Sequence, residues 1–470
     1  MVFPIVGGDG KPTGYEISNS LRFNDGDSPA LTRTMGAPTS TRKFTYVGWL
    51  KRSNLGIQSS FLSWGGSTYA TDFRYESSSN SLYFYFDDNT GWYAKTKSVY
   101  RDVSAWYQVV LAVDTTQATE SNRVKLYVNG TQYGSALDGT DWTQHEIFGQ
   151  NYDFPELANG QTMAIGKRNS SGSHFFDGYM SEVYFIDGQA LDSSYFGETD
   201  DNGVWIPKEY DGTYGNNGFL LQFKQTGTSQ NSSGIGADTS GNDNHFAVSN
   251  LAAIDVTTDT PTNNFATFNP LDNDTITGAA SFSEGNLVIN ANSDAQSGCP
   301  TTIAVSNGAW YIEGKCLSST FEIGVFGYGD GFSFNLANHP PYGDNGYPFA
   351  YNYGGDLTIN NSNSQTSVGT FTTNDILAIA LDMDNNTIKF FKNGSQVGST
   401  ITDSNLSTFA PYSFYVANHT ASNTTMFSLN TGNPAFSISS GNTDGKYGNF
   451  EYAPPSGYYA LCTKRLAEFG

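Results

Sequence analysis

The chain of 470 residues is poor in cysteine and in basic side chains. Its three cysteines, Cys299, Cys316 and Cys462, show neither metal-ligand spacing nor a disulfide framework, so we expect them to be buried as small apolar side chains. Lys and Arg number 23 against 45 Asp and Glu, which gives a net charge of −22. This acidic balance argues against nucleic acid as a partner, because binding it requires a basic surface, and we expect none.

Long apolar runs are also missing. No stretch approaches the roughly 20 apolar residues of a membrane-spanning helix. Residues 1–8 lack a basic segment followed by an apolar one, so the sequence predicts no secretory signal.

Aromatic and turn-forming residues are abundant instead. Phe, Tyr and Trp make up 15% of the chain, and 51 glycines stand among runs of Ser, Thr and Asn. This composition is typical of turn-rich β structure and argues against disorder. The length corresponds to two or three domains, and no helical periodicity marks an α-bundle. We therefore predict an all-β protein.

A hairpin pattern occurs twice. In residues 124–134 and again in 388–398, a run of β-forming residues is followed by an Asn-Gly pair, which readily forms a type I′ turn. Each follows an apolar strand ending in Asp, at residues 109–114 and 376–382. The repetition predicts two domains built on related antiparallel sandwich plans.

The first half contains an ordered set of motifs. These are the strands 44–50 and 81–86, the segment 106–114, the hairpin Leu126–Gly130, the triplet Ala164–Gly166 and the closing strand Phe176–Phe185. In this order they resemble the laminin-G-like, concanavalin A-like jelly roll, which implies such a β-sandwich over residues 1–195. Glu182 in the closing strand is expected to hold neighbouring backbone.

The second half has its own set. It comprises strands at 310–315, 322–325, 349–353, 376–382 and 411–416 together with the hairpin Phe390–Gly394. This series resembles the SPRY domain, a β-sandwich used for recognition, and implies a jelly-roll-type sandwich over residues 265–470. Asn374 stands where that family usually has Gly.

Residues 196–264 form a polar connecting segment. Residues 218–223 alternate like one more strand, so part of the segment is expected to pack on the first domain. Residues 257–264, rich in Thr and Asn, are expected to be the linker. The tandem in this order resembles virion proteins of tailed phages, especially marine ones.

Catalytic patterns are weak. Concanavalin A-like glucanases place carboxylates on one strand, and the carboxyls of retaining enzymes lie about 5 Å apart. Glu198 and Asp200 begin such a pattern, but Gly203 stands at the second Glu position. The five histidines are scattered and no nucleophile elbow occurs. We expect no enzymatic activity.

Calcium is the one cofactor that the sequence allows. Asp25 and Asp27, and separately Asp238 and Asp243, offer oxygen ligands in turns. Ca²⁺ takes six to eight oxygens, so each pair would need ligands from elsewhere, and such residues also simply form turns. No metal ligand is assigned.

Glycan binding would use aromatic rings beside Asn, Asp and backbone amides. Two groups fit this chemistry, and they contain Trp92, Tyr93, Tyr342, Asp344, Tyr347, Tyr351 and Tyr353. The resemblance to SPRY domains, which bind through loops at one end, favours the group in the second half. The same aromatics could instead pack loops onto sheets or be buried at subunit contacts.

Together these features predict a non-enzymatic virion structural protein of tail-fibre or appendage type. It would bind host surface polysaccharide or attach to another virion protein, as a homo-oligomer, and would be assembled in the host cytoplasm and released by lysis. A capsid decoration or head-fibre protein with a purely structural role is the alternative. A polysaccharide depolymerase would need a carboxylate pair assembled by the fold.

Overall fold

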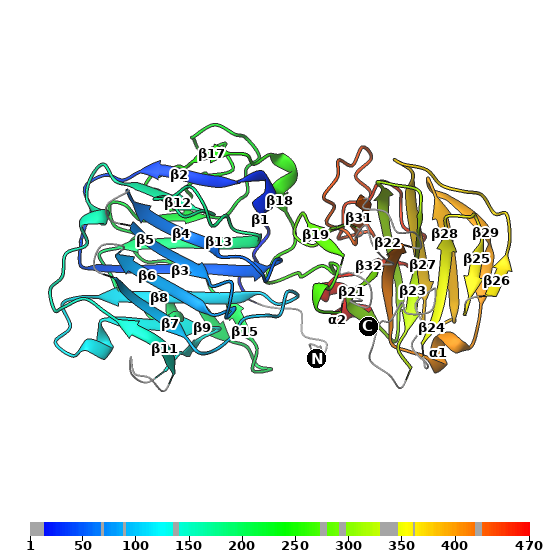
Figure 1. Ribbon diagram of the computed structural model, residues 1–470, viewed down its shortest axis with the longest axis horizontal. Helices are drawn as coiled ribbons and strands as arrows, with labels where there is room; N and C mark the ends of the chain where they lie inside the picture. Colours follow the sequence, from blue (N-terminus) through cyan, green and yellow to red (C-terminus); the bar gives the residue numbers. More distant parts are fainter. Residues whose placement is uncertain are drawn as a thin grey trace. The chain divides into compact units, whose positions relative to one another are not determined.

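The computed structural model describes residues 14–66, 70–87, 91–134, 141–272, 280–290, 298–329, 346–360, 362–418 and 425–470. The chain divides into two compact units, which we call the first unit (Pro12–Thr262) and the second unit (Asn263–Gly470). Each is an antiparallel β-sandwich, as predicted (Figure 1). In the described part of the chain no helix is both long and apolar enough to cross a membrane.

The first unit stacks two sheets. One has the order β10 (Thr131–Gln132), β9 (Val124–Val128), β8 (Tyr107–Asp114), β3 (Lys43–Arg52), β13 (Gly178–Asp187), β1 (Ser20–Phe23) and β18 (Val256–Thr257), with β16 (Phe219–Leu221) also paired to β13. The other has the order β11 (Trp142–Glu146), β7 (Trp92–Thr96), β6 (Leu82–Asp87), β5 (Ala70–Tyr75), β4 (Ser59–Gly65), β12 (Thr162–Ile165), β2 (Ala30–Thr34) and β17 (Ala247–Ser249). A short hairpin joins β14 (Gly197–Thr199) and β15 (Trp205–Pro207).

Alternation along the strands builds the core between these sheets. In β6, Leu82, Phe84 and Phe86 are fully buried, whereas Tyr83 and Tyr85 are half-buried. Side chains two residues apart share one face of a strand, so alternate aromatics meet in the interior. The core is aromatic throughout, and edge-to-face pairs such as Phe44 and Trp64, at 5.3 Å between centroids, are frequent in it.

The second unit repeats the plan. One sheet has the order β19 (Ser281–Ser283), β20 (Val288–Asn290), β31 (Thr425–Asn430), β22 (Ala309–Cys316), β27 (Ile376–Asp382), β28 (Thr387–Lys392) and β29 (Ser395–Thr402), and β32 (Tyr459–Ala460) pairs in parallel with β22. The other has the order β21 (Gly298–Val305), β30 (Tyr412–Asn418), β23 (Phe321–Gly327), β24 (Tyr347–Asn352), β25 (Leu357–Ile359) and β26 (Ser362–Gln365). The helices α1 (Asn405–Thr408) and α2 (Thr463–Phe469) are short.

Both predicted Asn-Gly hairpins are present. The first joins β9 to β10 and the second joins β28 to β29. In each turn both residues have positive φ, 46° and 80° at Asn129 and Gly130 and 50° and 76° at Asn393 and Gly394. These are the angles that a type I′ turn requires. The three cysteines are buried and free, as expected.

The expected linker is corrected by the structure. Strand β18 pairs with β1, and Asp259 is completely buried beside Lys51 of β3. In Figure 1 the green strands β17 and β18 lie beside the blue strands β2 and β1 of the first sandwich. The first unit therefore continues to Thr262, because a long-range ion pair and strand pairing hold a segment whose composition alone indicates a loop.

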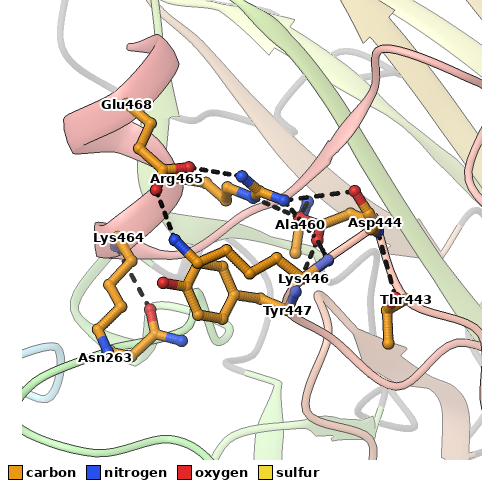
Figure 2. Close-up of polar contacts among 10 residues, drawn as sticks. Asn263, Thr443, Asp444, Lys446, Tyr447, Ala460, Lys464, Arg465 and Glu468 are labelled. Carbon is orange, nitrogen blue, oxygen red and sulfur yellow. Dashed lines mark hydrogen bonds and ion pairs between the residues drawn. The ribbon is translucent and has the colours of Figure 1, made fainter. Parts of the chain in front are cut away.

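Helix α2 is fixed to the second unit by Asp444 and Arg465 (Figure 2). The guanidinium of Arg465 donates hydrogen bonds from Nε and Nη2 to the two carboxylate oxygens of Asp444, each at 2.8 Å. Arg465 also forms an ion pair with Glu468. Burial favours the neutral acid, but the hydrogen bonds from Arg465 and from backbone N–H groups hold the pKa of Asp444 below its ordinary value. Asp444 is therefore a charged anchor for the helix.

We expect Asp444→Asn to lower the free energy of unfolding of the second unit by about 2 kcal/mol, because buried hydrogen bonds to a charged group are lost. A carboxylate with a depressed pKa stabilises the fold above its unfolded pKa, and this contribution disappears as the pH falls through the folded value. The variant should lack this part of the acid sensitivity. Calorimetric unfolding between about pH 3 and pH 7 measures both effects.

The pair Arg42 and Asp153 serves as a matched control. It has the same two-bond geometry, at 2.8 and 2.7 Å, but both side chains are largely exposed. Solvent screens an exposed pair, so Asp153→Asn should leave the unfolding transition of the first unit nearly unchanged. Equal losses from the two variants would contradict the role assigned to burial.

Candidate functional site

The aromatic residues predicted in the first unit do not form a binding surface together. Trp92 is half-buried and packs edge-on against Tyr152 at 4.5 Å and Phe148 at 6.1 Å, so it closes the end of the core. The next residue, Tyr93, instead contacts Tyr83 at 5.8 Å. Neighbouring residues of a strand point to opposite faces, which separates this pair.

The residues predicted in the second unit are likewise divided. Tyr351 is completely buried, its ring centroid lies 5.3 Å from that of Phe371, and its hydroxyl donates to the carbonyl of Gly369, so the structure places this side chain in the core. Tyr347 is half-buried and stacks on Phe409 at 4.9 Å, whereas Tyr353 is 43% exposed. Tyr342 and Asp344 lie outside the described residues.

A pocket of about 310 Å³ lies in the first unit, beside β13 and β16. We call it the tyrosine pocket. Four of its lining residues are tyrosines, accompanied by carboxylates, an amide and hydroxyls. The lining residues are Tyr15, Tyr184, Glu209, Tyr210, Asp211, Gly212, Tyr214, Leu220, Gln222, Thr239 and Ser240.

A β-bulge in β13 precedes Tyr184, the residue that this strand contributes to the pocket lining. The pairing of β13 with β3 shifts register between Ser181 and Tyr184, and within the bulge Glu182 has a φ of 47°. This angle is unfavourable for a residue with a side chain, and such strain persists where surrounding structure enforces it, often at functional sites. The bulge therefore fixes the direction of Glu182 and Tyr184.

Glu182 is buried below the pocket lining and accepts three hydrogen bonds. The donors are Tyr184 Oη at 2.6 Å, Gln222 Nε2 at 2.9 Å and Tyr15 Oη at 3.2 Å. Burial raises the pKa of Glu182, and these hydrogen bonds partly offset the rise. The expectation that Glu182 holds backbone is thus corrected, because its recorded partners are side chains that line the pocket.

The tyrosine rings are held in a fixed arrangement. The rings of Tyr184 and Tyr214 are parallel within 4°, with centroids 6.5 Å apart, and Tyr210 stands at 90° to Tyr214 at 5.2 Å. Burial raises the pKa of Tyr184 well above its ordinary value, and the adjacent Glu182 adds to the rise. The hydroxyl therefore keeps its proton at neutral pH.

The structure does not support Asp238 as a calcium ligand. The carboxylate of Asp238 accepts four bonds, from the backbone N–H groups of Leu220, Ser240 and Asn244 and from the Ser240 hydroxyl. These donors occupy the lone pairs that a cation would need. Within the described ranges, no three or more His, Cys, Asp or Glu side chains are grouped closely enough to hold a metal ion.

Comparison with protein families agrees with the two sandwiches. Residues 24–194 match the family model of the concanavalin A-like lectin/glucanases superfamily. Residues 310–429 match the model of the SPRY domain. The chain therefore carries a concanavalin A-like lectin/glucanase domain followed by a SPRY domain, two domain types that suggest binding to carbohydrate or protein.

Similar solved structures include the SPRY domain of human HERC1, which is 18% identical over 34% of this chain and 96% of that chain, with a TM-score of 0.29. A heptameric SAP-like pentraxin from Limulus polyphemus is 18% identical over 38% and 81%, with a TM-score of 0.28. The TRIM65 PSpry domain is 12% identical over 35% and 88%, with a TM-score of 0.27. Curated proteins give no match.

The tyrosine pocket could not be predicted from the sequence. Its residues come from position 15, from β13, from 209–222 and from 239–240, and no local pattern links these segments. One signal was available, since Tyr210 and Tyr214 stand close together in the segment 209–214, which is otherwise polar.

Proposed function

We propose that this protein is a non-enzymatic structural protein of a virion, of tail-fibre or appendage type, that binds host surface glycans. The tyrosine pocket carries the proposal, because aromatic faces beside carboxylate and hydroxyl oxygens are the surface that a sugar ring needs. The resemblance of the tandem to tailed-phage virion proteins supports the place in a particle. Attachment to another virion protein is the alternative role of the same domains.

The proposal includes the absence of catalysis. Glycoside hydrolysis requires a pair of carboxyl groups on either side of the scissile bond. Glu182 is 2% exposed and is engaged by Tyr15, Tyr184 and Gln222, so a glycosidic oxygen does not reach it. The proposed absence of catalysis would be contradicted if the protein released reducing ends from a bound polysaccharide and a folded Glu182→Gln variant did not.

We expect Tyr214→Ala to weaken glycan binding about tenfold or more, because the ring is half-buried in the pocket wall and its loss removes an aromatic contact. The measurement is a glycan array and host-cell binding assay with the purified full chain, followed by titration of the ligand found. Tyr195→Ala is the matched control, since Tyr195 is 47% exposed and outside the pocket lining.

The outcomes separate the alternatives. Saturable binding that Tyr214→Ala removes and Tyr195→Ala preserves supports the glycan-binding role. Absence of binding to every glycan and host cell would favour a decoration or assembly protein instead. Detection of the chain in purified particles tests the virion role separately, and its recovery from host cytosol alone would refute that role.

A further inference from the structure

The hydroxyl groups that line the tyrosine pocket are oriented by the protein. Five of them donate their hydrogen to a protein acceptor rather than to the pocket. Tyr15 and Tyr184 donate to Glu182, Tyr210 to the carbonyl of Thr213, Thr239 to Oε1 of Gln222, and Ser240 to Asp238. A hydroxyl has a single hydrogen, so toward a ligand these oxygens act as acceptors.

Gln222 and the two carboxylates of the lining have the same preference. The side-chain amide of Gln222 donates hydrogen bonds to Tyr15 and Glu182. Its Oε1 accepts hydrogen bonds from Thr239 and Lys224. Glu209 and Asp211 are exposed at the rim of the pocket and are acceptors when ionised. Every lining residue lies in the described part of the chain, and none is Lys, Arg or His.

Among the rings of Tyr184, Tyr210 and Tyr214, the one that is half-buried favours the same kind of ligand. Tyr184 and Tyr210 are nearly buried and pack beside Tyr214, whose ring is half-buried at the pocket. The face of an aromatic ring carries the negative side of its quadrupole, which attracts a cation. Carboxylates also lie near Tyr214. Burial is the largest cause of the raised pKa of its hydroxyl, and the charges of Glu182, Asp238 and Glu209 raise this pKa further. Although the ammonium of Lys224 lies against Gln222, the carboxylates outnumber it and disfavour an anionic sugar here.

We propose that the tyrosine pocket binds a glycan bearing a free, protonated amino group, that is, a deacetylated hexosamine. This inference rests on the proposed glycan-binding function and narrows its ligand class. An ammonium group supplies three donors and a positive charge, and the ring hydroxyls supply further donors for the remaining acceptors. A lysine side chain offers the ammonium alone on an apolar stem and would leave those acceptors unmet.

The test compares glucosamine tetrasaccharide with its fully N-acetylated counterpart, which has the same rings without charge. Both are titrated calorimetrically into the full chain at about pH 6, where an aliphatic amine is protonated. We expect the amino form to bind at least about tenfold more tightly, and added salt to weaken it. A sialylated or uronic-acid glycan should not compete.

Variants that remove the carboxylate charges at the pocket rim test whether those charges cause the preference for the amino sugar. The double variant Glu209→Gln/Asp211→Asn should reduce the affinity for the amino form and leave the folded structure intact, because both side chains are exposed. The control Glu120→Gln/Glu146→Gln removes the same charge from exposed positions outside the pocket lining and should change little.

Three results would overturn the inference. If the acetylated form binds equally or more tightly and Tyr214→Ala removes this binding, the pocket is a glycan site of a different class, and only the amino-sugar assignment fails. If oligolysine binds more tightly than the amino sugar, the ligand is a basic peptide. If no glycan of any kind binds, the proposed function itself fails, and the inference with it.

Discussion

Replacing Asp259 by Asn is expected to lower the free energy of unfolding of the first unit by about 3 to 5 kcal/mol, the cost of leaving one partner of a buried ion pair without the other. Lys51 and Asp259 are almost fully buried, with Nζ and Oδ2 2.8 Å apart. The indole of Trp106 also donates to Asp259 at 3.2 Å, and an Asn side chain can still accept that bond. The loss should therefore come chiefly from removing the negative charge that faces the buried ammonium of Lys51. Calorimetry or urea unfolding of the full chain measures it.

The double variant Lys51→Met/Asp259→Asn is the control. It removes both charges and keeps an apolar stem of similar length at position 51, so most of the lost stability should return. A single variant within about 1 kcal/mol of the unchanged protein would show that the pair does not hold residues 257–262 to the sandwich.

The second large effect is a pH dependence at Glu313. This residue of β22 is completely buried, and burial raises its pKa to about 7 although backbone N–H groups of Glu451 and Tyr452 and the side chains of Asn430 and Tyr311 donate to it. Because the folded state then binds a proton more tightly than the unfolded state, stability falls as the pH rises between the two pKa values. We expect Glu313 to contribute a decrease on the order of 3 kcal/mol between about pH 4.5 and pH 7.

The comparison with Glu313→Gln isolates this contribution. Gln resembles the protonated acid and does not titrate, so the stability difference between the two proteins should shift in favour of the variant as the pH rises. Any constant cost of the substitution cancels in this shift. A difference that stays constant from about pH 4.5 to pH 8 would mean that the carboxyl is already ionised at the lower pH.

The fold could be predicted from the sequence because its signals are local. The Asn-Gly turns at 129–130 and 393–394 each demand positive φ, and the apolar strand before each hairpin pairs with it as expected. Alternating side chains likewise distinguish Phe84, which is buried, from its half-buried neighbours.

The candidate site could not be predicted in this way. Tyr351 stands in an aromatic stretch whose sequence fits a ligand-binding surface and a buried core equally well. The register of β24 places its side chain in the core of the second unit. In the sequence, nothing distinguishes Glu182 from other glutamates in strands. Only the bulge in the pairing of β13 with β3 directs its carboxylate toward the hydroxyls of Tyr15 and Tyr184.

The sequence by itself determined the class of fold, the two sandwiches and their turns, because β-propensity, alternation and turn chemistry act over a few neighbouring residues. The tertiary structure alone decided that residues 196–262 complete the first sandwich and that distant tyrosines converge on Glu182. Those outcomes depend on pairings between residues as far apart as Lys51 and Asp259, whose energy appears only when the folded chain buries both charges together.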